Sequence, residues 1–340
     1  DLNCQFALAA AQQAVDQAGL TEGNFDPYRT GVIYGSGVGG LAVAEEEIPK
    51  LNAKGPGRVS PLCIPEMIAN MAAAYISMRF GFKGENFCPV SACATANHSI
   101  GEAMRAIRHG YQDIVLCGGT ENGIIPIALA GFSNMKALHT GDDPSCASIP
   151  FDARRSGFVM GEGAGCLVLE SLTHAQARGA TILAEVAGYG ASGDAYHITS
   201  PAPEGDAAAH AIRGAIEDAG LTPADVDYIN AHGTSTPLNE KYETIAIKKA
   251  FGDEAYKVKV SSTKSMTGHL LGGAAAVEAI ACVMAIRDGV VPPTIGYQEA
   301  DPDCDLDITP NRAVEMPVNV AISNSLGFGG HNACILIKKV

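Results

Sequence analysis

The pattern of apolar and polar positions divides the chain into helical and strand-like segments that recur. A helical pattern that begins near Ala11 ends at Ala-Gly-Leu-Thr, and an acidic turn and a short apolar strand follow; the same succession starts again at Ala211. Gly19 and Gly220 stand where a glycine commonly ends a helix. The chain therefore contains an internal repeat.

Two further pairs of segments match in the same order. Residues 88–110 and 258–289 each read as a strand, a turn of small residues and a long helix that closes on Ala-Ile-Arg-x-Gly. Residues 157–170 and 325–339 each contain a glycine-rich hairpin. Three matches in one order indicate a gene duplication, with the halves expected at residues 1–175 and 176–340.

Strands that alternate with helices predict an α/β protein with mostly parallel central strands, and the hairpin that ends each half adds antiparallel strands. In the second half the strand 182–190 precedes the repeated helix, whereas the first half begins directly in that helix. By symmetry, we expect the first half to lack its N-terminal strand. Residues 132–156 have no counterpart in the second half and are expected to form an inserted loop.

Composition and charge exclude several classes of function. The chain has 23 Lys and Arg against 37 Asp and Glu, and the resulting net charge of −14 disfavours binding to nucleic acids and anionic membranes. Apolar stretches such as 277–286 are shorter than the roughly 18 residues that a membrane helix needs. The 10 cysteines form no C-x-x-C pair, which favours a reducing compartment over a disulfide framework. The 39 glycines indicate many tight backbone turns.

Cys93 is the strongest candidate nucleophile. It stands in Val-Ser-Ala-Cys-Ala-Thr-Ala, after an apolar run and before a long helix, where small neighbours permit a sharp turn that exposes the thiol. A helix N-terminus also favours a thiolate. The alternative is that Cys93 is a small buried apolar residue, as most free cysteines are.

Two histidines are the candidate bases. His232 follows an apolar strand, at the end where open α/β sheets place ligand-binding residues. His269 lies in the repeat equivalent of the Cys93 segment, and a pseudo-twofold axis would bring these two turns towards one another. Lys264 stands on the His269 turn, and either pairs with Glu278 or is a solvated loop lysine. The Gly-Phe-Gly-Gly run at 327–330 offers backbone N–H groups for an oxyanion hole, or is an ordinary glycine-rich turn.

As a set, these motifs resemble β-ketoacyl-acyl-carrier-protein synthases of the elongating type I/II group, within the thiolase-like superfamily. The resemblance covers essentially the whole chain, and its motifs are Ser-Ala-Cys-Ala-Thr at Cys93, Pro-Phe-Asp at 150–152, Gly-Glu-Gly-Ala-Gly at 161–165, Asn-Ala-His-Gly-Thr at His232, Gly-His-Leu-Leu-Gly at His269 and Asn-Ser-Leu-Gly-Phe-Gly-Gly at 324–330. It implies a layered α-β-α-β-α fold of two duplicated halves with mixed five-stranded sheets. It also implies a decarboxylative Claisen condensation that elongates an acyl thioester with malonyl carrier protein in fatty-acid synthesis.

The resemblance assigns roles residue by residue. Cys93 takes the acyl chain, His232 and His269 stabilise the enolate of the malonyl unit, and the backbone N–H groups of Cys93 and Phe328 form the oxyanion hole. Phe328 also matches a gating phenylalanine. The remaining matches are Lys264 with Glu278 as an electrostatic pair, Thr234 and Thr236 as contacts of the pantetheine arm, Val38 and Phe132 as lining of the acyl pocket, and Arg58 and Lys136 as the basic residues that dock the carrier protein.

The resemblance further implies no metal and no cofactor beyond the phosphopantetheine arm on the carrier protein, a homodimer, and a place in the bacterial cytoplasm or an organellar matrix or stroma. The chain departs from the family pattern in three ways: the first strand is lacking, Leu326 replaces a phenylalanine in the gating loop, and Leu-Gly-Gly-Ala-Ala follows His269.

Four alternatives can be compared with these motifs. A thiolase would need a second reactive cysteine in the C-terminal hairpin, where residues 324–330 contain none. An initiating synthase primed by CoA would carry Asn in place of His269. A non-catalytic subunit that sets chain length would have lost Cys93. A polyketide-type ketosynthase shares the same motifs.

Overall fold

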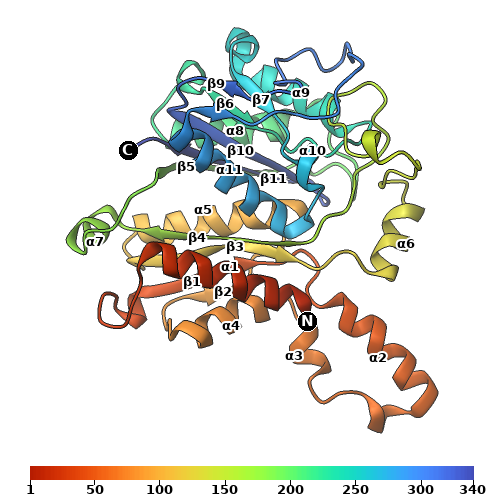
Figure 1. Cartoon of the computed structure of the whole chain (residues 1–340), viewed down its shortest axis with the longest axis vertical. Helices are drawn as coiled ribbons and strands as arrows, with labels where there is room; N and C mark the ends of the chain where they lie inside the picture. Colours follow the sequence, from red (N-terminus) through yellow and green to blue (C-terminus); the bar gives the residue numbers. More distant parts are fainter. The chain divides into compact units, whose positions relative to one another are not determined.

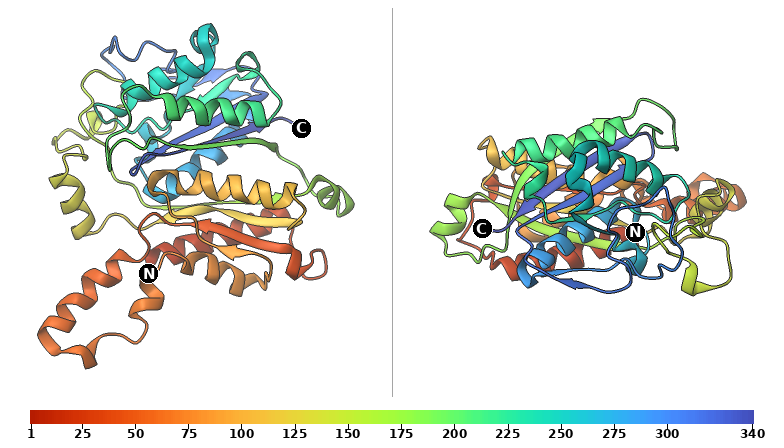
Figure 2. Two further views of the ribbon diagram at one scale, coloured as in Figure 1. Left: turned by 180° about the vertical axis from the view of Figure 1, so that it is seen from behind. Right: turned by 90° about the horizontal axis from the view of Figure 1, so that it is seen from above.

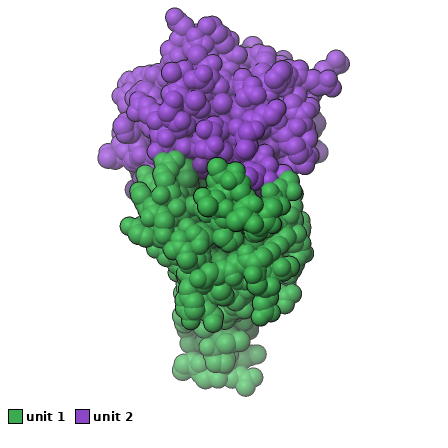
Figure 3. All heavy atoms as spheres, turned by 90° about the vertical axis from the view of Figure 1, so that its left-hand side faces the viewer, with its two compact units in different colours: residues 1–131, 162–181, 270–276 green, residues 132–161, 182–269, 277–340 purple.

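The computed structural model describes residues 1–340, which form two compact units (Figure 3). Unit 1 comprises residues 1–131, 162–181 and 270–276, and unit 2 comprises residues 132–161, 182–269 and 277–340. The units therefore differ from the expected linear halves, because residues 132–161 and 270–276 each pack with the opposite half. In the second exchange, the Gly272 N–H donates a hydrogen bond to the Glu121 carboxylate of unit 1, at 3.0 Å.

Unit 1 is built on a four-stranded mixed sheet (Figure 1). Its strands are β1 (Thr30–Gly35), β2 (Asn86–Phe87), β3 (Ile114–Glu121) and β4 (Gly163–Glu170), in the order β2-β1-β3-β4. β1 pairs in parallel with β2 and β3, whereas β3 and β4 are antiparallel. Every residue of β1 and β3 is buried, as expected of strands covered on both faces.

Helices cover both faces of this sheet. They are α1 (Leu2–Ala18), α4 (Met71–Phe80) and α5 (Thr95–Arg108). α1 packs on β4 and α4 on β1, while α5 lies on the opposite face (Figure 1). Gly19 ends α1 with φ 66°, which confirms its expected place at the helix end. The remaining helices of this part of the chain are α2 (Leu41–Lys54), α3 (Cys63–Met67), α6 (Pro126–Asn134) and α7 (Leu172–Ala177).

Unit 2 is built on a five-stranded mixed sheet. Its strands are β5 (Glu185–Gly193), β6 (Tyr228–Asn230), β7 (Lys259–Ser261), β10 (Val320–Gly327) and β11 (His331–Lys338), in the order β5-β11-β10-β6-β7. β6 pairs in parallel with β7 and β10, while β11 is antiparallel to both its neighbours. A separate two-stranded sheet pairs β8 (Val290–Val291) with β9 (Val314–Glu315).

Helices α8 (Asp206–Asp218) and α9 (Asn239–Phe251) cover one face of this sheet, and α11 (Ala274–Asp288) covers the other (Figures 1 and 2). Ala211, Ile212, Ala246 and Ile247 of α8 and α9 share a core with sheet residues such as Ile322. On the opposite face, the Cys282 thiol of α11 donates to the Ile322 carbonyl, at 3.6 Å. The short helix α10 (Lys264–Thr267) follows β7.

The two sheets repeat one topology. The order β2-β1-β3-β4 in unit 1 corresponds to β7-β6-β10-β11 in unit 2, with the same parallel and antiparallel pairings. The fifth strand of unit 2, β5, contains most of residues 182–190 and has no equivalent beside β4. The predicted duplication is therefore visible in the strand order, and the sheet of unit 2 has one strand more than the sheet of unit 1. No helix of the chain is long and apolar enough to span a membrane.

Candidate active site

Cys93 lies on a sharp turn of unit 1, as the sequence predicted. It is the middle residue of the 3₁₀ turn Ala92–Ala94, which leads directly into α5. Ala92 has φ 50°, a left-handed conformation that alanine rarely adopts. The Ser91 N–H donates to the Thr95 hydroxyl at 2.9 Å, which closes the turn. Cys93 itself is half-buried.

The second half contains an equivalent turn. Leu271–Gly273 is also a 3₁₀ turn that leads into a long helix, and Leu271 has φ 49°. The matching strained residues, Ala92 and Leu271, place Gly272 at the position equivalent to Cys93. His269 therefore lies on the chain that enters this turn, three residues before the counterpart of the thiol.

His232 lies just beyond the carboxyl end of β6, and a buried carboxylate holds its backbone. The His232 and Gly233 N–H groups donate to the two oxygens of Glu243, at 2.7 and 2.9 Å. Asn324 of β10 donates its amide to the same carboxylate at 2.8 Å. Glu243 comes from the first turns of α9, so this helix fixes the segment on which His232 stands.

Lys264 is buried and pairs with Glu278, so it is not the solvated loop lysine that the sequence allowed as the alternative. Its Nζ donates to the His232 carbonyl at 2.7 Å and forms an ion pair with Glu278 of α11. The Nζ also lies 3.5 Å from His232 Nδ1. Because an ammonium group only donates, Nδ1 of His232 acts as the acceptor, and the ring proton is placed on Nε2.

The two histidine rings pack against each other within unit 2. Their centroids are 5.3 Å apart, at an interplanar angle of 86°. Burial, Lys264 and the neighbouring His269 lower the pKa of His232 well below 6.5, while burial and Lys264 lower that of His269. Both imidazoles are therefore neutral at pH 7. Both ring nitrogens of His269 are buried and make no hydrogen bond within the protein.

A series of aromatic contacts extends from the histidines to the β10–β11 turn. Phe158 packs edge-on against His269 at 5.3 Å and against Phe132 at 5.4 Å, and Phe132 lies 6.3 Å from Phe328. Phe328 stands in the turn between β10 and β11. Unit 2 thus brings together two of the predicted phenylalanines and both histidines.

Val38 and the two basic residues lie on exposed parts of the chain. Val38 is 47% exposed on the loop after β1 in unit 1. Its N–H donates to the buried Glu121 carboxylate at 3.2 Å, and the Gly37 N–H and the Ser36 hydroxyl donate to the same group at 2.8 Å. Arg58 is exposed in the 3₁₀ turn Pro56–Arg58 that follows α2 in unit 1, and Lys136 is exposed after α6 in unit 2.

Thr234 and Thr236 lie two residues apart on the turn after His232. Their hydroxyls are 3.0 Å apart and hydrogen-bonded to each other. Thr234 is buried and Thr236 is half-buried, so the pair reaches from the interior towards the surface.

Three further residues that contact this site were not predicted from the sequence: Glu243, Asn324 and Phe158. Glu243 lies near the start of a helix, where a carboxylate usually faces solvent, and only the fold shows that it faces the His232 turn. Phe158 lies in the matched hairpin 157–170, and nothing in the sequence distinguishes it from the other hairpin residues. Asn324 begins the Asn-Ser-Leu-Gly-Phe-Gly-Gly motif, which was the one available indication.

The chain is similar to known proteins over its whole length. The family models described as the N-terminal and C-terminal domains of beta-ketoacyl synthase match residues 1–175 and 183–298. A relative named 3-oxoacyl-[acyl-carrier-protein] synthase 2, from Synechocystis sp., is 52% identical over 340 residues, which are 100% of this chain and 82% of the relative.

Solved structures show the same fold. One contains a type II polyketide acyl carrier protein in complex with its ketosynthase bound to the hexaketide; it is 36% identical with a TM-score of 0.97, and the match covers 100% of this chain and 85% of that one. A beta-ketoacyl synthase from Burkholderia phymatum is 33% identical with a TM-score of 0.94, covering 100% of this chain and 83% of that one.

The fold and these relatives define an acyltransferase of the thiolase-like class. Within that class, the chain belongs to the β-ketoacyl synthase family. The expected fold class and the resemblance to elongating synthases are confirmed. The expected activity, that of a 3-oxoacyl-[acyl-carrier-protein] synthase of fatty-acid elongation, is confirmed by relatives that match over the whole chain.

Proposed function

We propose that Cys93, His232 and His269 together carry out the decarboxylative condensation, on an acyl carrier protein as substrate. The observation that carries this proposal is the pair of buried, neutral histidines, of which one has its proton placed on Nε2 and the other has no protein hydrogen bond. Such groups can donate hydrogen bonds to an oxygen that gains negative charge. The Cys93 turn supplies a thiol at the N-terminus of α5.

The first half-reaction transfers the acyl group. The Cys93 sulfur attacks the thioester carbonyl of an acyl carrier protein, and the pantetheine thiol leaves with the proton, so that the acyl chain is held as an enzyme thioester. The N–H groups of Cys93 and Phe328 stabilise the negative oxygen of the tetrahedral intermediate. Phe328 gates this step through its ring contact with Phe132.

The second half-reaction joins the two carbon chains. The bond between the malonyl carbon and its carboxylate breaks, CO₂ leaves, and the electron pair forms an enolate whose oxygen accepts hydrogen bonds from Nε2 of His232 and His269. The enolate carbon attacks the Cys93 thioester, and the thiolate leaves. The product is a 3-oxoacyl chain on the carrier protein, two carbons longer.

Lys264 acts on the histidines rather than on substrate. Its ammonium faces Nδ1 and the carbonyl of His232, so it disfavours a second ring proton and keeps the donor at Nε2. Glu278 balances this buried charge. An ion pair of this kind, with one partner removed, leaves an uncompensated charge inside the protein.

The remaining assignments concern binding. Val38 and Phe132 line the acyl pocket, Thr234 and Thr236 contact the pantetheine arm, and Arg58 and Lys136 dock the carrier protein. The solved relative with a bound acyl carrier protein supports such a partner. The active form is a homodimer, to which exposed apolar residues of α2 and α3, such as Ile48 and Ile64, contribute. The reaction uses no metal and no cofactor beyond the carrier's arm, and proceeds in the bacterial cytoplasm or an organellar matrix or stroma.

A polyketide-type ketosynthase is the second candidate, because the structure with the TM-score of 0.97 is of that kind. Product analysis separates the two candidates. After incubation with acyl carrier protein primers of graded length and malonyl carrier protein, the fatty-acid enzyme is expected to add one unit to saturated primers. Repeated addition to unreduced 3-oxoacyl primers would favour the polyketide activity.

The histidine roles are tested by separating the half-reactions. His269→Ala is expected to retain most acyl transfer to Cys93 and to lose condensation by a factor of about 10² or more, since one enolate donor is gone. His210→Ala, an exposed histidine on α8, is the matched control and should change neither. Equal loss of both half-reactions in His269→Ala would contradict the assignment to the malonyl unit.

A further inference from the structure

The turn that carries Thr234 and Thr236 is held in a conformation that its sequence does not favour. Ser235, between the two threonines, has φ 72° and is fully buried. Serine rarely adopts this left-handed conformation, so surrounding contacts must impose it.

All polar groups of Ser235 are engaged. Its N–H donates to Glu240, its hydroxyl accepts from the Ile149 N–H at 3.0 Å, and its carbonyl accepts from the Gly157 N–H at 2.9 Å. Ile149 and Gly157 lie on either side of the Pro-Phe-Asp motif at 150–152, to which the sequence assigned no role. The segment 149–157 therefore packs directly against the threonine turn.

Arg155, from the same segment, completes the enclosure. Its Nε donates to the Thr236 carbonyl and its Nη2 to the Pro237 carbonyl, both at 3.0 Å. Its Nη1 donates to Asp301 at 2.6 Å and to the Asp152 carbonyl at 3.0 Å. The guanidinium thus holds two successive carbonyls of the turn on one side and a carboxylate on the other.

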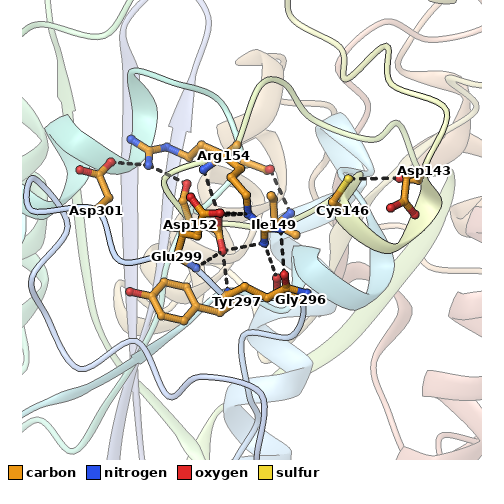
Figure 4. Close-up of polar contacts among 12 residues, drawn as sticks. Asp143, Cys146, Ile149, Asp152, Arg154, Gly296, Tyr297, Glu299 and Asp301 are labelled. Carbon is orange, nitrogen blue, oxygen red and sulfur yellow. Dashed lines mark hydrogen bonds and ion pairs between the residues drawn. The ribbon is translucent and has the colours of Figure 1, made fainter.

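The charges around Arg155 are arranged to keep it in place. Its side chain is only 5% exposed, and Glu240 lies 3.4 Å from its Nε with a fully buried side chain. Burial raises the pKa of Glu240 to about 7, against the opposing effect of Arg155. Figure 4 shows the neighbouring half of the network, in which Asp152 binds Arg154 and the backbone of Glu299 while Asp301 lies to the other side. Asp152 also accepts a hydrogen bond from the Gln298 N–H. Because the buried Arg155 guanidinium makes this many hydrogen bonds, it is fixed in one orientation.

We propose that Arg155 is a positioning residue for the pantetheine arm: it fixes the Thr234–Thr236 turn so that the two threonine hydroxyls meet the amides of the arm. The inference rests on the proposed function, which places the arm at these threonines. Because the two hydroxyls bond to each other, one of their protons remains available to an amide carbonyl. Rotation of Ser235 out of its left-handed conformation would separate the pair.

The experiment compares two acyl donors that differ in the arm alone. One is an acyl-pantetheine, and the other is the S-ethyl thioester of the same acid, which keeps the thioester and lacks both amides. The second-order rate of Cys93 acylation by each donor is measured by intact mass. In Arg155→Met, the preference for acyl-pantetheine is expected to fall about tenfold, with the S-ethyl rate within about a factor of two of the wild type.

Arg154→Met is the matched control, because Arg154 is adjacent, pairs with Asp152, and makes no hydrogen bond to the threonine turn. Its preference should equal that of the wild type. Arg155→Lys is expected to recover only part of the preference, since an ammonium cannot reproduce the planar fork that binds two carbonyls. If Arg155→Met does not fold, Asp301→Asn removes the charged partner of Arg155 and should shift the preference in the same direction.

The outcomes separate the two levels of the claim. Suppose that the wild type is acylated by both donors. An unchanged donor preference in Arg155→Met and Asp301→Asn would then overturn the role of Arg155 alone. Equal rate losses with both donors in these variants would overturn it as well. Failure of both donors to acylate wild-type Cys93 would overturn the proposed function, and this inference with it.

Discussion

At the scale of single residues, the site depends on two histidine side chains that are buried and neutral. His232 and His269 are buried beside a lysine, and their pKa values lie well below 6.5. A neutral imidazole carries one N–H group, which can donate a hydrogen bond to an enolate oxygen at physiological pH. The Lys264 ammonium determines which nitrogen of His232 is the donor.

The low histidine pKa values predict a particular dependence on pH. In the unfolded chain a histidine takes up a proton near pH 6.5. Between that pH and the lower folded pKa the unfolded state binds more protons, so the free energy of unfolding falls as the pH falls. For each histidine the slope is about 1.4 kcal/mol per pH unit. Above pH 7 this contribution is constant.

Urea unfolding of the wild type and of His269→Gln between pH 8 and pH 5 measures the effect as a difference, which cancels other titrating groups. The wild type is expected to show the steeper loss below pH 6.5. Decarboxylation of a malonyl thioester should show no midpoint at pH 6.5. A histidine midpoint there, or parallel unfolding curves, would contradict neutral, buried rings.

At the scale of elements, the two strained turns before α5 and α11 show what the sequence could and could not predict. The repeat located both turns and the additional strand of the second half, because small residues and apolar strands leave local patterns. The order of the strands in each sheet came only from the structure. The burial of Glu121, Glu240 and Glu243 left no such pattern, since it arises when separate segments meet. The packing of residues 270–276, from the second half of the sequence, within unit 1 likewise depends on a tertiary contact.

Close packing of α8 on β5 is a second feature of this scale. A Cβ at Gly190 would lie 1.9 Å from the Ala211 carbonyl oxygen and 2.6 Å from the Ala215 nitrogen. Gly190→Ala must push the helix off the sheet, and we expect a loss of about 3 kcal/mol in the free energy of unfolding. Urea denaturation measures it.

Gly214→Ala is the control on the helix side of the same contact. Its Cβ would meet the Gly190 Cα at 3.5 Å, an ordinary contact, and alanine favours the helix by about 0.5–1 kcal/mol. This variant should be neutral or more stable. Equal destabilisation by both substitutions would show that the contact tolerates no side chain at all and would refute the distinction.

At the scale of the whole molecule, the net charge of −14 opposes the approach of any negatively charged partner. The proposed docking of a carrier protein therefore relies on local basic residues, and Arg58 and Lys136 are both exposed. Arg58→Glu and Lys136→Glu are each expected to raise KM for the acyl carrier protein about fivefold, with a smaller effect at high salt. KM for acyl-pantetheine should not change.

Lys339→Glu changes the net charge by the same amount at another exposed position and serves as the control. Steady-state kinetics with both substrates gives the answer. If all three variants weaken carrier binding equally, total charge rather than a docking patch is responsible.

The most direct test of the account is the mass of the protein after incubation with an acyl carrier protein in the absence of a malonyl donor. We expect one added acyl group, located on the peptide that contains Cys93, and no addition to Cys93→Ala. Half-buried thiols such as Cys63 and Cys146 should remain unmodified. An acyl group that persists in Cys93→Ala, or that maps to another cysteine, would contradict the central claim that Cys93 carries the growing chain.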